Sequence, residues 1–217
     1  MLKIGLTGGI ASGKSTVGEM FVKRGAHLLQ ADAIAHSLME PDRPVYTEIV
    51  RHFGTGILNP DRSINRSRLA EAAFGKASQP ADLAAARVQE LNAIVHPAVI
   101  AYENEWMAEI GANHRKAIAI VEAALILEAG SEGRFDALIV VTCTPKQRIQ
   151  RFARRHGLSE GAAQDEVTRR MAAQLPDEKK VGAADFVIDN SGSIASTEQQ
   201  VERVFSALQG KMQNGPR

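Results

Sequence analysis

The chain of 217 residues has little cysteine, no long apolar run and almost no net charge. Cys143 is the only cysteine, which excludes an intrachain disulfide and a thiolate metal cluster and favours a reducing compartment. No apolar run approaches the roughly 20 residues of a membrane span, and the N-terminus lacks the apolar core of a signal peptide. Because 26 Lys and Arg balance 25 Asp and Glu, no basic excess favours nucleic acid or a membrane as a partner. We expect a soluble, cytoplasmic protein, either a monomer or a weak homo-oligomer.

Short apolar runs alternate with helical patterns along the chain. The runs predict five strands at Leu2–Thr7, Ala26–Gln30, Ile118–Glu122, Leu138–Cys143 and Phe186–Asp189. They are continuous in apolar character, which is typical of parallel strands that are buried on both faces. Strands separated by helices predict an α/β fold with a five-stranded parallel sheet flanked by helices.

Two stretches depart from this alternation within what we expect to be a single domain, 1–217. Residues 33–95 are mostly helical in pattern, contain no convincing strand, and are interrupted by prolines and glycines, which predicts an inserted helical subdomain. Residues 145–180 are highly charged and rich in helix-forming residues, which predicts a pair of helices that form a lid. The segments 1–32, 96–144 and 181–217 would then form the core of the domain.

A phosphate-binding loop follows the first predicted strand. Gly8, Gly13, Lys14 and Ser15 satisfy the pattern G-x-x-x-x-G-K-[ST], with a strand before it and a helical pattern after it. Glycines let backbone N–H groups converge on phosphate oxygens, and the helix directs its positive end toward the same anion. We expect Lys14 to reach the β- and γ-phosphates and the Ser15 hydroxyl to ligate Mg²⁺. The predicted ATP-binding residues in this segment are Gly8, Gly9, Ala11, Ser12, Gly13, Lys14, Ser15 and Thr16. The fold class is therefore a three-layer P-loop NTPase type.

The rest of the sequence narrows the class of P-loop protein. No Asn-Lys-x-Asp segment is present, which argues against a GTPase. Glu122 ends a predicted strand and is only a weak candidate for the acidic residue of a motor ATPase. The small size and the charged late segment favour a kinase of a small molecule, and a P-loop regulatory ATPase remains the alternative from another class.

Asp32 and an arginine face are the candidates for further chemistry. Asp32 follows the second predicted strand at the edge where ligands bind in α/β sheets, so it could accept a proton from an acceptor hydroxyl. It is equally suited to cap a helix that begins near Ala33. Arg148, Arg151 and Arg155 lie three and four residues apart, so they share one helical face that would either close over a triphosphate or remain solvated.

The sequence closely resembles the dephospho-CoA kinase family over nearly its whole length. The matching segments are Leu6–Thr16, Ala31-Asp32 with His36, His96-Pro97, Arg151 with Arg155, Gln174, and Phe186–Gly192. The resemblance implies that ATP, with Mg²⁺, phosphorylates the ribose 3′-hydroxyl of dephospho-CoA in the final step of coenzyme A biosynthesis. It implies catalytic roles for Asp32 as base and for Lys14 and Arg155, and it makes residues 33–95 the CoA-binding subdomain.

The resemblance also extends to residues whose roles stay open. It places Arg151 and Asn190 at ATP, although Asn190 is equally typical of a turn. It places His96, Pro97 and Leu125 at the acceptor, although a lone histidine is more often structural, and Pro97 disfavours a helical conformation at His96.

Two departures and two charged pairs complete the predictions. The family's Val-Pro-Leu-Leu type of segment here contains Ala124 in place of proline, and its Arg-Asp pair in the lid is here Arg155-His156. The spacing of Asp165 with Arg169 and of Glu166 with Arg170 predicts two surface ion pairs.

Overall fold

The computed structural model describes residues 1–74 and 81–214 of the chain, which divide into two compact units. The first unit comprises Met1–Gln30 and Met107–Arg217, and the second comprises Ala31–Trp106. This division differs from the expected insertion of residues 33–95 because the helix α5 (Ala81–Asn113) continues without a break past residue 95.

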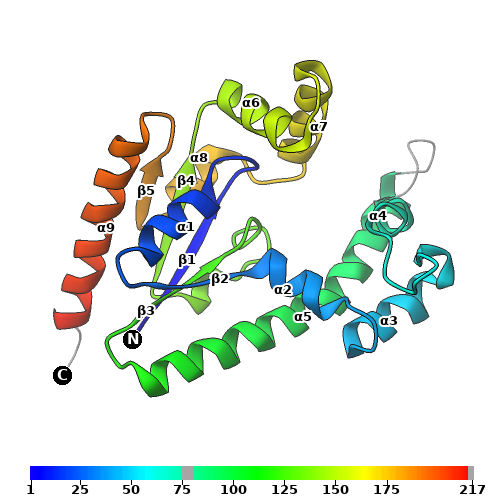
Figure 1. Ribbon diagram of the computed structural model, residues 1–217, viewed down its shortest axis with the longest axis horizontal. Coiled ribbons are helices and arrows are strands. Elements are labelled where there is room, and N and C mark those ends of the chain that lie inside the picture. Colours follow the sequence, from blue (N-terminus) through cyan, green and yellow to red (C-terminus); the bar gives the residue numbers. More distant parts are fainter. Residues whose placement is uncertain (75–80, 215–217) are drawn as a thin grey trace. The chain divides into compact units, whose positions relative to one another are not determined.

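The first unit is built on a five-stranded sheet (Figure 1). Its strands are β1 (Leu2–Gly8), β2 (His27–Gln30), β3 (Ile118–Glu122), β4 (Ala137–Thr142) and β5 (Phe186–Asp189). All neighbouring pairs are parallel, and the spatial order is β2-β3-β1-β4-β5. The five predicted strands are therefore confirmed, and no end differs by more than one residue.

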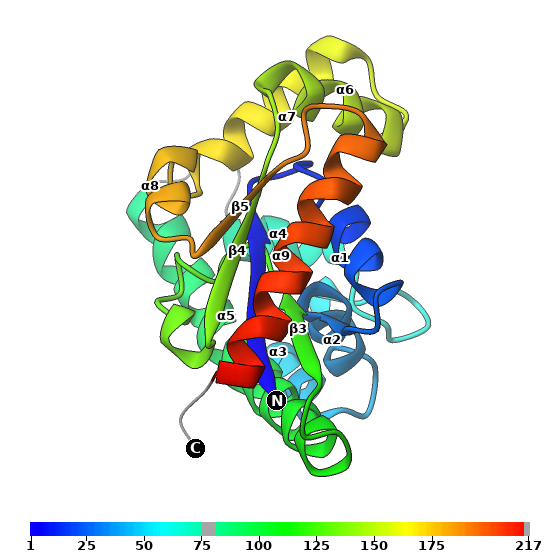
Figure 2. The ribbon, with the colours of Figure 1, turned by 90° about the vertical axis from the view of Figure 1, so that its left-hand side faces the viewer.

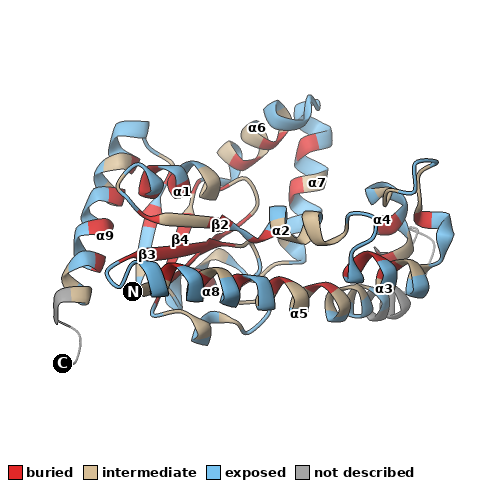
Figure 3. Cartoon of the chain, turned by 60° about the horizontal axis from the view of Figure 1, so that its bottom comes forward, coloured by how far each residue is buried: buried red, intermediate tan, exposed pale blue. Residues whose placement is uncertain are grey.

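Helices cover both faces of this sheet. On one face, α1 (Lys14–Val22) and α9 (Ile194–Asn214) pack on β1, and Leu6, Phe21 and Phe205 belong to the shared core (Figures 1 and 2). On the other face, Leu138 and Val140 of β4 form a smaller cluster with Ile126. Every residue of β3 is buried, which explains the continuous apolar runs in the sequence (Figure 3).

The region predicted as a lid contains three helices, α6 (Pro145–His156), α7 (Glu160–Ala172) and α8 (Asp177–Gly182), and not the predicted pair. Helix α6 begins at a capping box formed by Thr144 and Gln147. Phe152 of α6 packs with Ala163 and Val167 of α7, and Ile10 and Ala11 of the phosphate loop join this apolar cluster. The lid and the loop thus share one small core.

The charged pairs predicted on α7 are only partly correct. Glu166 receives hydrogen bonds from Arg170 and, through two nitrogens, from Arg169. Arg169 therefore pairs with Glu166 and not with Asp165, because the i,i+3 geometry allows a two-pronged contact. The side-chain hydrogen bond from Arg169 is the largest cause that lowers the pKa of Glu166 to about 2.

The second unit is helical where it is described. Its elements are α2 (Ala31–Leu38), α3 (Pro44–Phe53), the short 3₁₀ helix η1 (Thr55–Ile57), α4 (Arg66–Phe74) and the first part of α5. Its described residues contain no strand, only an isolated bridge between Leu58 and Ile64, as the sequence pattern predicts. A further 3₁₀ helix, η2 (Glu132–Arg134), belongs to the first unit. None of the helices in the described parts of the chain is long and apolar enough to cross a membrane.

The expectation that His96 is not helical is wrong. His96 and Pro97 both lie inside α5. Proline at this position loses one backbone hydrogen bond and disfavours the helical conformation of the residue before it. Val95 and Val99 on either side are buried, so the apolar burial of the helix outweighs the local preference.

Candidate active site

The phosphate loop connects the central strand β1 to α1. The backbone curls tightly, with Ser12 N donating to the Gly9 carbonyl at 3.3 Å and Val17 N donating to the Gly13 carbonyl at 3.1 Å. Gly13 has a φ of 96° and precedes the first residue of α1 without a capping side chain. The N–H groups of the first helical turn have no acceptor within the helix, so they suit an anion. This conformation is the one that the sequence motif predicts.

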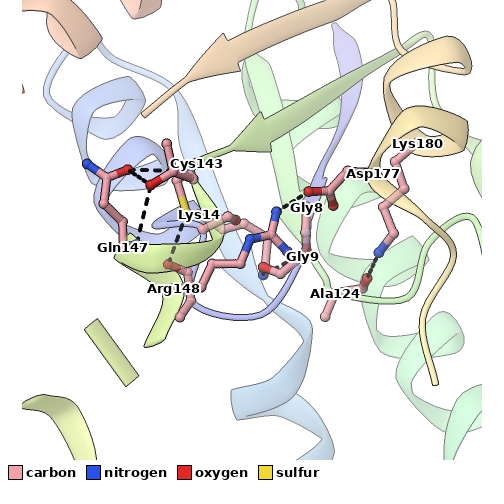
Figure 4. A network of polar contacts seen from close by, with 12 residues as sticks. Gly8, Gly9, Lys14, Ala124, Cys143, Gln147, Arg148, Asp177 and Lys180 are labelled. Carbon is pink, nitrogen blue, oxygen red and sulfur yellow. Dashed lines mark hydrogen bonds and ion pairs between the residues drawn. The ribbon is translucent and has the colours of Figure 1, made fainter. Parts of the chain in front are cut away.

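Lys14 lies folded over the loop (Figure 4). Its Nζ donates to the carbonyls of Gly8 at 3.0 Å and of Gly9 at 3.2 Å. The ammonium group is therefore held at the loop, next to the backbone that is expected to bind phosphate.

Ser15 is linked to the carboxyl ends of two strands. Its Oγ donates to Oε1 of Glu122 at 2.7 Å, and Gln30 Nε2 donates to the second carboxylate oxygen at 3.0 Å. Glu122 is buried at the end of β3, so its carboxylate joins the start of α1 to β2 and β3. Sequence analysis assigned Glu122 only a weak role, because a single acidic residue after a strand does not reveal its partners.

The Ser15 and Glu122 oxygens are suitable ligands for Mg²⁺, which prefers hard oxygen donors. Within the described residues, no three His, Cys, Asp or Glu side chains form a group that could hold a metal ion.

Arg151 and Asn190 both donate hydrogen bonds to the backbone of the phosphate loop. Arg151 donates to the Ser12 carbonyl at 3.1 Å and to the Asn190 carbonyl at 2.8 Å. Asn190 Nδ2 also donates to the Ser12 carbonyl, at 2.9 Å, while its Oδ1 accepts from Thr197 at 3.1 Å. A Cβ atom at Gly13 would lie 2.1 Å from Asn190 Nδ2. Both ends of the Asn190 amide are therefore engaged with the protein.

Arg148, whose role the sequence left ambiguous, is buried at the loop. Its guanidinium forms an ion pair with Asp177 of α8 and lies against Gly9, where a Cβ atom would be 2.0 Å from Arg148 Nη1 (Figure 4). Arg155, one turn beyond Arg151, is exposed and makes no hydrogen bond or ion pair with the described residues. The three arginines of one helical face thus have three different environments.

Cys143 directly follows β4, and its thiol can donate to the Ala11 carbonyl of the phosphate loop at 3.8 Å. Burial raises the pKa of the Cys143 thiol, and the nearby charges of Arg148 and Arg151 only partly oppose this shift. The thiol therefore remains protonated at neutral pH, which does not suit a nucleophile.

The segment after β3 is held by its backbone despite the missing proline. The Ala124 carbonyl accepts hydrogen bonds from Thr7 Oγ1 at 3.3 Å and from Lys180 Nζ at 3.4 Å. Ala123 N also donates to the Leu6 carbonyl at 3.1 Å, which extends the sheet contact by one residue. The next side chain, Leu125, is exposed.

In the second unit, Asp32 lies in the first turn of α2. The helix begins at Ala31, two residues earlier than a capping role for Asp32 requires, so Asp32 lies inside the first turn and not at the N-cap. A carboxylate in the first turn still interacts favourably with the helix dipole. His36 lies one turn further along, and its pKa is lowered by partial burial and then by Arg66, while Asp32 opposes the shift. Along the chain, Asp32 follows Gln30 by two residues, and Gln30 is bonded to Glu122.

Sequence analysis missed Asp177, Lys180 and Glu128. Asp177 is the partner of Arg148, and the fully buried Lys180 pairs with Glu128 at 2.8 Å. No signal in a single sequence separates Lys180 from its exposed neighbour Lys179.

Comparisons with known proteins identify the family of this chain. The dephospho-CoA kinase family model matches residues 2–196. Dephospho-CoA kinases from Corynebacterium efficiens and Aquifex aeolicus are 39% and 38% identical over 208 residues, covering 96% of this chain and 98% of each relative. A solved structure from Thermus thermophilus covers 95% of this chain and 97% of its own, with 30% identity and a TM-score of 0.75. The chain therefore belongs to the dephospho-CoA kinase family.

Proposed function

We propose that this protein transfers the γ-phosphoryl group of ATP to the ribose 3′-hydroxyl of dephospho-CoA and releases coenzyme A and ADP. The observation behind the proposal is the family match over residues 2–196, which includes the phosphate loop, the lid and Asp32. The geometry of the loop supports ATP as the donor, because Lys14 and the start of α1 direct positive charge to one place.

The donor side relies on the loop and its supports. Backbone N–H groups of the loop and Lys14 would bind the β- and γ-phosphates and stabilise the charge of the transferring group. Ser15, positioned by Glu122, would hold Mg²⁺, which neutralises phosphate charge when it is bound. Arg151 and Asn190 would keep the loop in the conformation that binds ATP, since both donate to the Ser12 carbonyl.

The acceptor side relies on Asp32. In the proposed step, its carboxylate orients the 3′-hydroxyl and accepts its proton as the oxygen attacks the phosphorus in line. The position of Asp32 along the chain supports this role. Asp32 lies two residues after Gln30, which ends β2 and donates a hydrogen bond to Glu122. We also propose that His96, Pro97 and Leu125 contact the acceptor, and that Arg155 moves from solvent to the phosphates during transfer.

A direct assay tests the activity. Purified protein incubated with Mg-ATP and dephospho-CoA is expected to yield coenzyme A, detected by its mass. Adenosine and ordinary ribonucleotides offered as acceptors at the same concentration measure selectivity. The absence of coenzyme A at high enzyme concentration would refute the proposed function.

Asp32→Asn separates a catalytic role from a structural one. We predict that turnover falls by roughly 10²–10⁴-fold, because the acceptor hydroxyl loses its base. The affinity for ATP, measured by titration calorimetry, should change by less than about twofold, because the amide keeps the shape of the side chain. Glu40→Gln, an exposed carboxylate beyond α2, is the matched control and should keep normal turnover. Near-normal turnover of Asp32→Asn would reduce Asp32 to a helix-stabilising residue.

A further inference from the structure

Helix α8 is only six residues long, yet it forms two ion pairs whose cations are buried. Asp177 pairs with Arg148 of α6, and Lys180 pairs with Glu128 of the segment after β3. Arg148 is 1% exposed and Lys180 is 0% exposed. Because positions 177 and 180 are three residues apart, both side chains leave the same face of the helix. One short helix therefore contacts the two sides of the site.

The first pair acts on the phosphate loop. The Arg148 guanidinium lies so close to Gly9 that a single added methyl group would overlap it. The carbonyl of Gly9 also accepts from Lys14 Nζ at 3.2 Å. Asp177 accepts from Nη2 of the guanidinium while Nη1 is the atom nearest Gly9, so Asp177 helps to determine how the arginine contacts the loop backbone (Figure 4).

The second pair acts on the segment that contains Leu125. Lys180 Nζ contacts Glu128 Oε1 at 2.8 Å and the Ala124 carbonyl at 3.4 Å, so it holds the segment at both ends. Leu175 N, just before α8, donates to the same Glu128 oxygen at 2.9 Å. The Ala124 carbonyl is bonded in turn to Thr7, the residue before Gly8.

We propose that α8 is a positioning helix for both substrates. Asp177, acting through Arg148, sets the loop for ATP, and Lys180, acting through Glu128 and Ala124, sets the Leu125 segment for the acceptor. The identity of the acceptor rests on the proposed function. A positioning role suits buried ion pairs, which add little net stability compared with apolar residues of the same size but specify one geometry.

Two variants and two neighbouring controls test this division. Asp177→Asn is expected to raise the KM for ATP and the Kd for a non-hydrolysable ATP analogue about tenfold, with the KM for dephospho-CoA within about twofold. Lys180→Met is expected to raise the KM for dephospho-CoA about tenfold, with both ATP constants within about twofold. Glu178→Gln and Lys179→Met alter the exposed neighbours on α8 and should behave as the unaltered protein.

A double variant distinguishes loss of positioning from a folding defect. Lys180→Met leaves Glu128 with an unpaired charge, whereas Lys180→Met combined with Glu128→Gln removes both charges and should fold, as circular dichroism would show. The double variant is expected to show the same selective rise in the KM for dephospho-CoA. The proposal is overturned if the KM and Kd values of the variants match those of their controls, or if each variant raises the KM values for ATP and dephospho-CoA equally. If the unaltered protein makes no coenzyme A, the proposed function fails, while analogue binding by Asp177→Asn still decides the ATP side of the inference.

Discussion

Replacing Asn190 by alanine is predicted to destabilise the protein even when no nucleotide is present. The side chain is buried and joins three elements, since it follows β5, donates to Ser12 of the phosphate loop and accepts from Thr197 of α9. A residue that served only to contact the adenine of ATP would leave the nucleotide-free protein unchanged. Thermal unfolding without ATP therefore separates the two roles.

The size of the effect follows from the contacts that are lost. Each buried hydrogen bond contributes about 1 kcal/mol, so the two side-chain bonds of Asn190 amount to about 2 kcal/mol. For a chain of this length, each kcal/mol shifts the unfolding temperature by about 2–4 °C, which gives a decrease of about 4–8 °C. The Ser12 carbonyl keeps the bond from Arg151, which prevents a larger loss.

Differential scanning calorimetry of the nucleotide-free protein provides the measurement. Gln199→Ala, which removes an exposed amide from α9, is the control and should leave the unfolding temperature nearly unchanged. Thr197→Val removes the partner of Asn190 Oδ1, so its effect should not add fully to that of Asn190→Ala in the double variant. An unaltered unfolding temperature in Asn190→Ala, together with weakened ATP binding, would show that the side chain acts on the nucleotide and not on the loop.

Three further changes test other parts of the site. Gly9→Ala should lower the affinity for ATP about tenfold in titration calorimetry, because the added methyl group would displace the buried Arg148 guanidinium. Gly192→Ala is the control, since its methyl group has room and should leave the affinity unchanged. Equal ATP affinities of the two variants would contradict the contact between Gly9 and Arg148. Glu122→Gln should raise the Mg²⁺ concentration for half-maximal activity roughly 10-fold or more, because it removes the charge that positions Ser15, and the exposed Glu132→Gln is its control. Glu166→Gln tests the ion pairs of α7. The folded pKa of Glu166 is depressed from 4.5 to about 2, so its contribution is present above about pH 4.5 and is lost as the pH falls toward 2. The contribution is about 1 kcal/mol or less at this surface site, so unfolding temperatures of variant and unaltered protein should differ slightly at pH 6 and converge near pH 2, while a constant gap would refute the assignment.

The sheet and the phosphate loop could be predicted because their signals are local. Each strand is a short continuous apolar run, and burial on both faces requires that pattern wherever the strand pairs. The loop needs its glycines and Lys14 at fixed spacing, so the motif alone defines the turn between β1 and α1. The family resemblance, carried by the same segments, is confirmed by the match over residues 2–196.

Conformations that depend on tertiary packing could not be predicted in this way. The rule that a residue before proline avoids the helix applies to an isolated chain, and it gave the wrong result at His96 inside α5. At His96 the local preference is worth less than the apolar contacts that the folded helix makes. Arg169 is a different case, because its partner lies in the same helix: the sequence predicted Asp165, and the side-chain geometry selected Glu166, three residues away.

The buried charges of the site are invisible in the sequence for a related reason. Lys179 and Lys180 are chemically identical neighbours, but the orientation of α8 exposes the first and buries the second against Glu128. A charged stretch is normally solvated, so the prior expectation for all of residues 145–180 favours an exposed face. Arg148 violates it because the carboxylate of Asp177 neutralises its charge, which is the condition for burying a charge.

The distribution of arginines along α6 explains how one helical face can serve both structure and chemistry. Arg148 pairs with Asp177, and Arg151 donates to the carbonyls of Ser12 and Asn190, so moving either arginine would break contacts that hold the loop and its supports. Arg155, on the same face but in the last turn, is exposed and would lose only water when it binds a phosphate. Among these three arginines Arg155 alone is exposed, and this exposure supports the role in transfer that we propose for it. The regular spacing seen in the sequence therefore joins two residues that contact the loop or its supports to one that faces solvent.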